Sequence, residues 1–211
     1  MRILFCKISS MKYYKGACDA DEPRYGGKFV EENGYGHEEL NFCPVLMEDS
    51  EEEECVGFVE PMSNRGYANS LHIEKIEECA AFNHEPFVDD VLVVWCAKMD
   101  EYRGVTVVGW YKHARVWRNL QEWTLTYSDG SEDERNYNVR AKASNCVLLP
   151  PTERSDWIWK IHSAKYTKAY GFGQHMVWYP TEPEAAVFIS RLLNNIENYR
   201  GENWLNKYPE I

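Results

Sequence analysis

The sequence lacks the motifs that mark the common classes of self-sufficient enzyme. It contains no G-x-S-x-G nucleophile turn, no G-x-x-x-x-G-K-[ST] phosphate loop and no H-E-x-x-H zinc motif. The nearest approach to a metal-dependent nuclease centre is the pair Asp89 and Asp90, and acids at the start of a strand more commonly form turns. We therefore expect a binding module that is not an enzyme and that needs no metal or cofactor.

Cysteine pairs with zinc-binding spacing and long apolar runs are also absent. The seven cysteines include no C-x-x-C pair, and Cys6, Cys96 and Cys146 lie in apolar runs typical of reduced core residues. The apolar run at residues 1–6 is too short for a signal peptide, and no other run is long enough to cross a membrane. We expect a cytoplasmic protein without a membrane partner.

Positive charge is scarce, since 23 Lys and Arg stand against 34 Asp and Glu and the formal net charge is −11. This balance disfavours non-specific binding to nucleic acid, because phosphate contacts supply most of that affinity. Residues 48–54 hold six carboxylates, a pattern more typical of a solvated loop than of a functional patch. The cations gather in short stretches elsewhere, so one face of the protein can still be positive.

Apolar and aromatic residues are plentiful, at 44% and 14% of the chain, which is enough for a sizeable core. Residues 91–97 are apolar on both faces, as in a central strand, and we expect them to pair antiparallel with 105–111. The Gly-rich segment 9–41 predicts a long loop. Further strands are predicted at 2–8, 56–59, 123–127, 138–143 and 146–149. We expect one α+β domain over residues 1–211, with a curved, mainly antiparallel sheet or a small β-barrel flanked by helices.

A C-terminal amphipathic helix is predicted over residues 181–200. Thr181 is its expected N-cap, with Glu184 as the capping-box partner. Val187 is expected to extend the apolar face of this helix. The centre of that face, which we expect to pack across the sheet, is formed by Phe188, Leu192 and Ile196.

Three segments combine rings, cations and hydrogen-bonding groups in the manner of base-binding surfaces. They are residues 9–15 after the first strand, residues 109–118, and residues 170–179. Glycines on both sides of Phe172 let the backbone approach a ligand or a neighbouring strand closely. Each segment has a plainer alternative: the second can be an edge strand with solvated cations, and the third a tight core turn beneath the helix.

The chain resembles the PUA-like superfamily, and within it the EVE and YTH-type domains that read modified bases. Three stretches carry the resemblance: the Lys/Ser exit of the first strand at residues 6–10, the apolar strand at 90–97, and the Val-Val-Gly-Trp sequence at 107–110. The chain is also similar to the reader modules found beside HNH-type nucleases in modification-dependent restriction proteins. The resemblance implies a flipped base of modified DNA or RNA in an aromatic pocket, a role in restriction or defence, and a nuclease subunit or domain that performs cleavage.

Under this hypothesis the base is held by rings and polar side chains, and the candidates are Ser9, Ser10, Tyr13, Trp95, Trp110, Trp117, Gln174 and Trp178. Phosphate contacts are expected from Lys12, Lys112, His113 and Arg115. The three segments must then converge on one pocket. The competing hypothesis is an acidic protein-interaction or inhibitory module, which binds a basic partner through residues 48–54. It is favoured if the segments lie apart or if the Trp rings are wholly buried.

Overall fold

The computed structural model describes residues 1–26, 32, 35–61, 70–99, 104–126, 129–161 and 169–210. Its strands are β1 (Ile3–Ile8), β2 (Pro44–Leu46), β3 (Glu53–Gly57), β4 (Phe87–Lys98), β5 (Val105–Thr126), β6 (Glu132–Lys142), β7 (Cys146–Leu148), β8 (Lys160–Ile161) and β9 (Val177–Trp178). The helix α3 spans Ala186–Glu197. Short 3-10 turns lie at His37–Leu40, Ile73–Lys75, Ala80–Phe82, Ala143–Asn145, Glu153–Ser155, Trp157–Trp159, Pro183–Ala185 and Trp204–Asn206.

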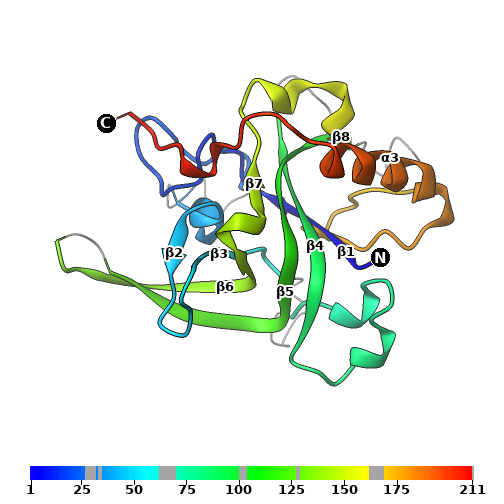
Figure 1. Cartoon of the computed structure of the whole chain (residues 1–211), viewed down its shortest axis with the longest axis horizontal. Helices are drawn as coiled ribbons and strands as arrows, with labels where there is room; N and C mark the ends of the chain where they lie inside the picture. The colour runs from blue at the N-terminus through cyan, green and yellow to red at the C-terminus, as the bar shows by residue number, and fades with distance from the viewer. Residues whose placement is uncertain are drawn as a thin grey trace.

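The strands form one mixed sheet in the order β2-β3-β6-β5-β4-β1-β9, with β7 and β8 paired to β5 beside this path (Figure 1). β1 runs parallel to β4, and the other described pairings are antiparallel. The expected α+β class and the mainly antiparallel sheet are confirmed, including the pairing of 91–97 with 105–111. The described strands do not close, so the barrel alternative is not formed.

Alternation along the central strands separates two apolar clusters, one on each face of the sheet. In β4, Val93 and Trp95 belong to one cluster, while Val94 and Cys96 belong to the other. The first cluster joins Cys55 of β3 to Val177 of β9, strands towards the two ends of the sheet, so the sheet curves around this cluster. The second cluster contains the buried face of α3.

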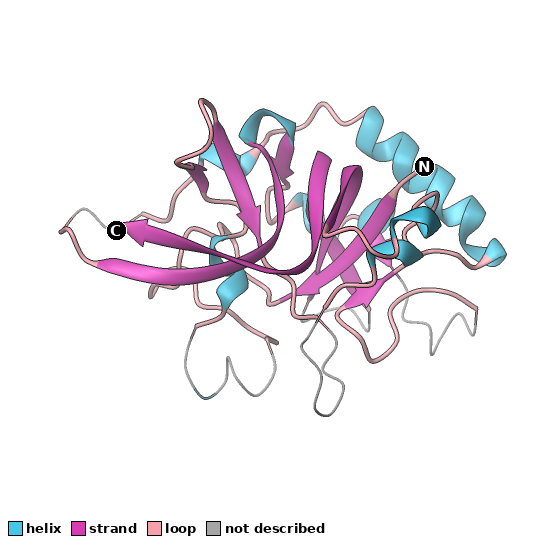
Figure 2. Cartoon of the chain, turned by 90° about the horizontal axis from the view of Figure 1, so that it is seen from below, coloured by secondary structure: helices cyan, strands magenta, loops and turns pink. Residues whose placement is uncertain are grey.

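The long strand β5 joins the body of the protein to a projecting arm. It runs down the centre of the sheet beside β4, and its register with β6 shifts between Val116 and Gln121. Beyond the shift, β5 and β6 pair with each other as a two-stranded ribbon that extends away from the body (Figure 1). Seen from below, the arm and α3 lie at opposite ends of the molecule (Figure 2). The alternation of apolar residues in the sequence predicted two separate strands, at 105–111 and 123–127, whereas the structure has one continuous strand there.

The apolar face of α3 is buried as expected, with Phe188, Leu192 and Ile196 at 7%, 0% and 2% exposure. Two details of the helix differ from expectation. Thr181 is not the N-cap, because a 3-10 turn at Pro183–Ala185 precedes α3 and no side chain caps the helix. Val187 is 83% exposed, because it lies one residue from the buried stripe and faces solvent.

All seven cysteines are free thiols. Cys6, Cys96 and Cys146 are buried, which confirms their assignment to the core. Within the described residues, no helix is long and apolar enough to span a membrane.

Candidate functional site

A cavity of about 620 Å³ lies where β1 ends, and we call it the loop cavity. Its volume falls within the range of roughly 300–1,000 Å³ that is typical of ligand pockets. The lining comes from the loop after β1, from residues 19–25, from the end of β4, and from the segment 151–160. The residues that matter below are Ser10, Met11, Lys12, Arg24, Tyr25, Met99 and Lys160.

A buried carboxylate fixes one side of this loop. Asp21 is 2% exposed and accepts hydrogen bonds from the backbone N–H groups of Lys12 (2.6 Å), Tyr13 (2.8 Å) and Tyr14 (3.2 Å). Three donors compensate the carboxylate for its lost hydration, which would otherwise make burial unfavourable. Tyr14 has a left-handed φ of 54°, a conformation that persists only where its surroundings impose it.

A buried cation fixes the other side. Arg154 is 3% exposed and donates to the carbonyl oxygens of Met11 (2.6 Å), Lys12 (2.7 Å) and Leu149 (2.9 Å). Burial lowers the pKa of Arg154, while the nearby Tyr14 and Asp21 favour its charged form. The backbone of residues 11–14 is therefore clamped between two opposite buried charges. Such a rigid loop is suited to holding a ligand in one position.

The mouth of the loop cavity is richer in cations than the chain as a whole. Lys12, Arg24 and Lys160 line it together with the exposed carboxylates of Asp19 and Glu22. A fourth cation, Lys98, lies 4.3 Å above the ring of Tyr25. Positive charge thus gathers beside an accessible ring, although the chain has a net charge of −11.

Three of the expected cage tryptophans are core residues. Trp95 is fully buried in the cluster enclosed by the curved sheet, while Trp110 and Trp178 lie in the cluster beneath α3, at 1% and 5% exposure. Gly57 makes room for Trp95, because a Cβ atom at that glycine would lie 2.5 Å from the Trp95 ring. The expected tryptophan cage is therefore wrong: these rings occupy opposite faces of the sheet and stabilise the fold.

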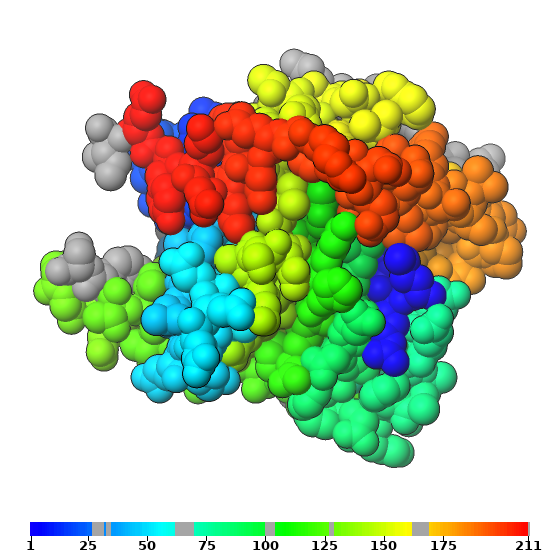
Figure 3. All heavy atoms as spheres, viewed as in Figure 1, coloured from blue at the N-terminus to red at the C-terminus, as the bar shows by residue number. Residues whose placement is uncertain are grey.

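The other base-binding candidates are dispersed. Tyr13 stacks on Trp204 at 5.3 Å, where the C-terminal segment crosses the surface (Figure 3, red). Trp117 is half-buried against Phe87 and Tyr137. Ser10 lines the loop cavity. None of the other base-binding candidates lines this cavity, and of the remaining two Ser9 is buried and Gln174 is exposed.

The expected phosphate-binding residues are dispersed as well. Lys12 lines the loop cavity, whereas Lys112 and His113 line a different cavity of about 380 Å³. Carboxylates already pair with these side chains of β5: Lys112 contacts Glu197 at 3.0 Å, His113 contacts Asp90 at 2.6 Å, and Arg115 binds Asp89 through two hydrogen bonds. The expectation that residues 9–15, 109–118 and 170–179 converge on one pocket is therefore wrong for the described residues.

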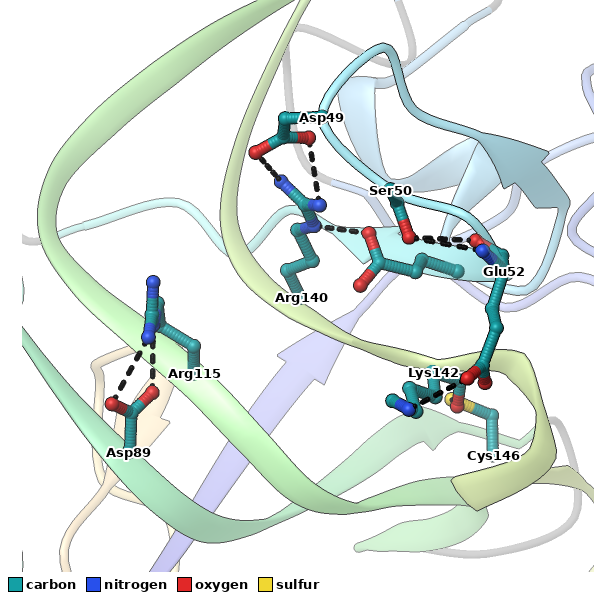
Figure 4. A network of polar contacts seen from close by, with 9 residues as sticks. Asp49, Ser50, Glu52, Asp89, Arg115, Arg140, Lys142 and Cys146 are labelled. Atoms are coloured by element: carbon teal, nitrogen blue, oxygen red, sulfur yellow. Dashed lines mark hydrogen bonds and ion pairs between the residues drawn. The ribbon is translucent and has the colours of Figure 1, made fainter.

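The acidic run at residues 48–54 is partly neutralised within the fold. Arg140 of β6 binds both carboxylate oxygens of Asp49, at 3.0 and 2.8 Å (Figure 4), and it also contacts Glu54. Lys142 contacts Glu52 at 2.8 Å in the same network. Half of the six carboxylates therefore fasten the β2–β3 hairpin to β6. This pairing reduces the charge that the run could offer to a basic partner.

Asp21 and Arg154 were not among the residues that sequence reasoning selected. Asp21 lies in a Gly- and Asp-rich loop, where an acid that accepts backbone N–H groups is common, so a weak signal existed. Nothing near Arg154 in the sequence indicates that it reaches the loop after β1, because 142 residues separate it from Lys12.

Comparison of the chain with protein-family models, curated proteins and solved structures finds no match. Within the part of the chain that the structure describes, no group of three His, Cys, Asp or Glu side chains is arranged to hold a metal ion.

Proposed function

We propose that this chain is a nucleic-acid-binding module of the PUA-like, EVE/YTH type that recognises a modified base, methylated or hydroxymethylated, in the loop cavity. The observation that carries the proposal is the clamp of Asp21 and Arg154, which fixes the loop beside a cavity with a cationic mouth. A fixed loop lowers the entropic cost of binding.

The chemistry of the lining suits a flipped base and its phosphates. The ring of Tyr25 is 41% exposed and offers a stacking surface, and Met11 and Met99 add apolar contacts suited to a methyl group. Lys12, Arg24 and Lys160 at the mouth supply charge for the flanking phosphates. Stacking of about 1–3 kcal/mol per base can offset the few kcal/mol that flipping costs.

The proposal includes a division of labour between recognition and cleavage. The module would deliver a modified DNA or RNA site to a nuclease subunit or domain, as in restriction or defence. Among the described residues the three segments do not converge and the tryptophan cage is not formed, so the proposal rests on the loop cavity alone. Against the acidic protein-binding module stands the pairing of three carboxylates of the acidic run with Arg140 and Lys142.

The test is binding to oligonucleotides with and without 5-methylcytosine, 5-hydroxymethylcytosine or N6-methyladenine. We expect preference for one modified form. Tyr25→Asn should weaken that form about 5- to 150-fold, which corresponds to the loss of one stacking contact. Asn is chosen because Tyr25 has a φ of 61°, which Asn tolerates better than Ala.

Lys12→Gln should weaken all sequences similarly and reduce the salt slope by about one unit, as a phosphate contact requires. The matched control is Lys142→Gln, which removes a cation that contacts Glu52 and does not line the loop cavity. Equal affinity for modified and unmodified strands, or equal losses from the Lys12 and Lys142 variants, would refute the proposal.

A further inference from the structure

A further cavity is lined by the last two residues of β1, Lys7 and Ile8. It measures about 360 Å³ and shares no described lining residue with the loop cavity. Its walls come from the end of β1, the turn at 37–40, the segment after β3 and the residue before β9. We call it the Glu38 cavity. Its chemistry is set by Lys7, His37, Glu38, Phe58, Glu60 and Met176.

Glu38 presents a buried carboxylate to this cavity. Its side chain is 8% exposed, and it accepts a hydrogen bond of 3.2 Å from the N–H of Ser9. A carboxylate has about four acceptor positions, so Glu38 retains capacity for further donors. A buried carboxylate with spare acceptor capacity on a cavity wall favours a ligand that brings N–H groups.

Two donors lie at the same end of β1. Lys7 lines the cavity, and its ammonium is 5.9 Å from the Phe172 ring centroid, with no carboxylate paired to it among the described residues. Burial lowers the pKa of Lys7, so an acceptor on a ligand would restore part of the hydration that its charged form has lost. The Ser9 hydroxyl is fully buried and has no hydrogen-bond partner in the described part of the chain.

The remaining walls suit a flat ring. The rings of His37 and Phe58 pack against each other, with their centroids 5.0 Å apart, and form one aromatic wall, to which Met176 and Ile8 add apolar surface. Flat heterocycles bind such walls through stacking and thioether contacts. The cavity thus combines an apolar wall with the buried carboxylate of Glu38, the exposed carboxylate of Glu60 and the donor side chain of Lys7.

We infer that the Glu38 cavity binds a guanine ring. The Watson–Crick edge of guanine carries two adjacent N–H donors, at N1 and N2, followed by the acceptor O6. A carboxylate can accept both donors side by side, and an ammonium can donate to O6. Adenine offers one amino group beside an acceptor nitrogen and so leaves the carboxylate short of a donor. This inference does not depend on the proposed function, because a free nucleoside would suffice as ligand.

The test uses guanosine, inosine and adenosine with protein that carries ¹³C-methyl methionine. Met176 reports on the Glu38 cavity, and Met11 and Met99 report on the loop cavity. Guanosine should shift the Met176 signal and leave the other two in place. Inosine lacks the N2 amino group, so it should bind at least about tenfold more weakly, because part of the carboxylate is then unpaired.

The variants separate recognition from folding. Glu38→Gln keeps an oxygen for the Ser9 N–H but loses the anionic pair of acceptors, so guanosine binding should fall at least about tenfold. Lys7→Met keeps the apolar stem and should weaken guanosine while leaving the melting temperature close to that of the parent. The control is Glu197→Gln, which lies outside this cavity.

Equal binding of the three nucleosides, or a guanosine shift at Met11 and Met99 instead of Met176, would overturn the inference. If Glu38→Gln fails to fold, Lys7→Met and the nucleoside series decide the matter. The outcomes also separate the two proposals, because modified oligonucleotides that shift only Met11 and Met99 would support the loop cavity even if guanosine does not bind.

Discussion

Removal of the Asp21 carboxylate is the most direct test of the clamped loop. In Asp21→Ala, the N–H groups of Lys12, Tyr13 and Tyr14 all lose their acceptor. Asp21→Asn keeps one side-chain oxygen but directs an amide N–H toward the same donors. The two variants therefore remove the acceptor to different degrees without changing the lining of the cavity elsewhere.

The loss of stability in these variants depends on which of the three backbone N–H groups can bond to water instead of Asp21. Lys12 is exposed and Tyr13 half-buried, so water can replace part of their hydrogen bonding, whereas Tyr14 is fully buried. Leaving a buried donor unpaired costs about 1–3 kcal/mol, and hydrogen bonds to charged groups contribute about 1.5–3 kcal/mol each. We expect Asp21→Ala to lower the free energy of unfolding by about 2–4 kcal/mol, and Asp21→Asn by about 1–2 kcal/mol.

The measurement is urea unfolding, combined with hydrogen exchange at the Tyr14 amide. Exchange at Tyr14 should accelerate in both variants, and more in Asp21→Ala. Asp19→Ala is the matched control, because Asp19 lines the same cavity but is exposed, and its removal should leave both readouts unchanged. A loss below about 0.5 kcal/mol for Asp21→Ala, the range of ordinary surface changes, would refute the clamp as the structure presents it.

Four further outcomes are expected. Trp110→Ala should cost about 3–5 kcal/mol of stability, because the ring fills the core beneath α3; a variant that kept full stability and lost only ligand binding would restore the cage hypothesis. Thiol labelling of the native protein should be fastest at Cys18, which is exposed, and slow at Cys6 and Cys96, where burial raises the thiol pKa. The pKa of these two thiols is higher in the folded protein than in the unfolded chain, so their contribution to stability should be complete below about pH 8.5 and lost as the pH rises further. Urea unfolding should therefore give a lower free energy of unfolding at pH 10 than at pH 7. Pure protein should leave nucleic acid intact, and chelator-sensitive cleavage that disappears in an Asp89→Ala, Asp90→Ala double variant would contradict this.

Local patterns predicted the frame of the fold. The run at residues 91–97 is apolar on both faces, and such a strand can only lie in the middle of a sheet that is covered on both sides. The spacing of Phe188, Leu192 and Ile196 identified the face of α3 that packs on that sheet. Both patterns lie within a few consecutive turns or residues of one element, so they can be recognised in a single sequence without knowledge of the fold.

The composition of the candidate site misled in one respect. A cluster of rings and cations binds a ligand best if the rings are exposed and the cations have charge left for it. Both properties depend on contacts with residues far away in the sequence, so the cluster itself does not reveal them. The double-sided burial of the central strands takes Trp95 and Trp110 into the core. The partners of Lys112 and Arg115 come from α3 and from β4, at distances along the chain that no motif encodes.

The strand order explains why the end of β1 is the part of the molecule that faces both candidate cavities. β1 is the parallel strand between β4 and β9, so its carboxyl end lies beside the carboxyl end of β4 and the segment that leads into β9. The chain must leave the sheet there, and Asp21 and Arg154 fix the path it takes. Ser10 and Lys12 consequently face the loop cavity, while Lys7 and Ile8 face the Glu38 cavity. A ligand in either cavity would therefore lie against residues of the same short stretch of chain, 7–12, at the end of β1.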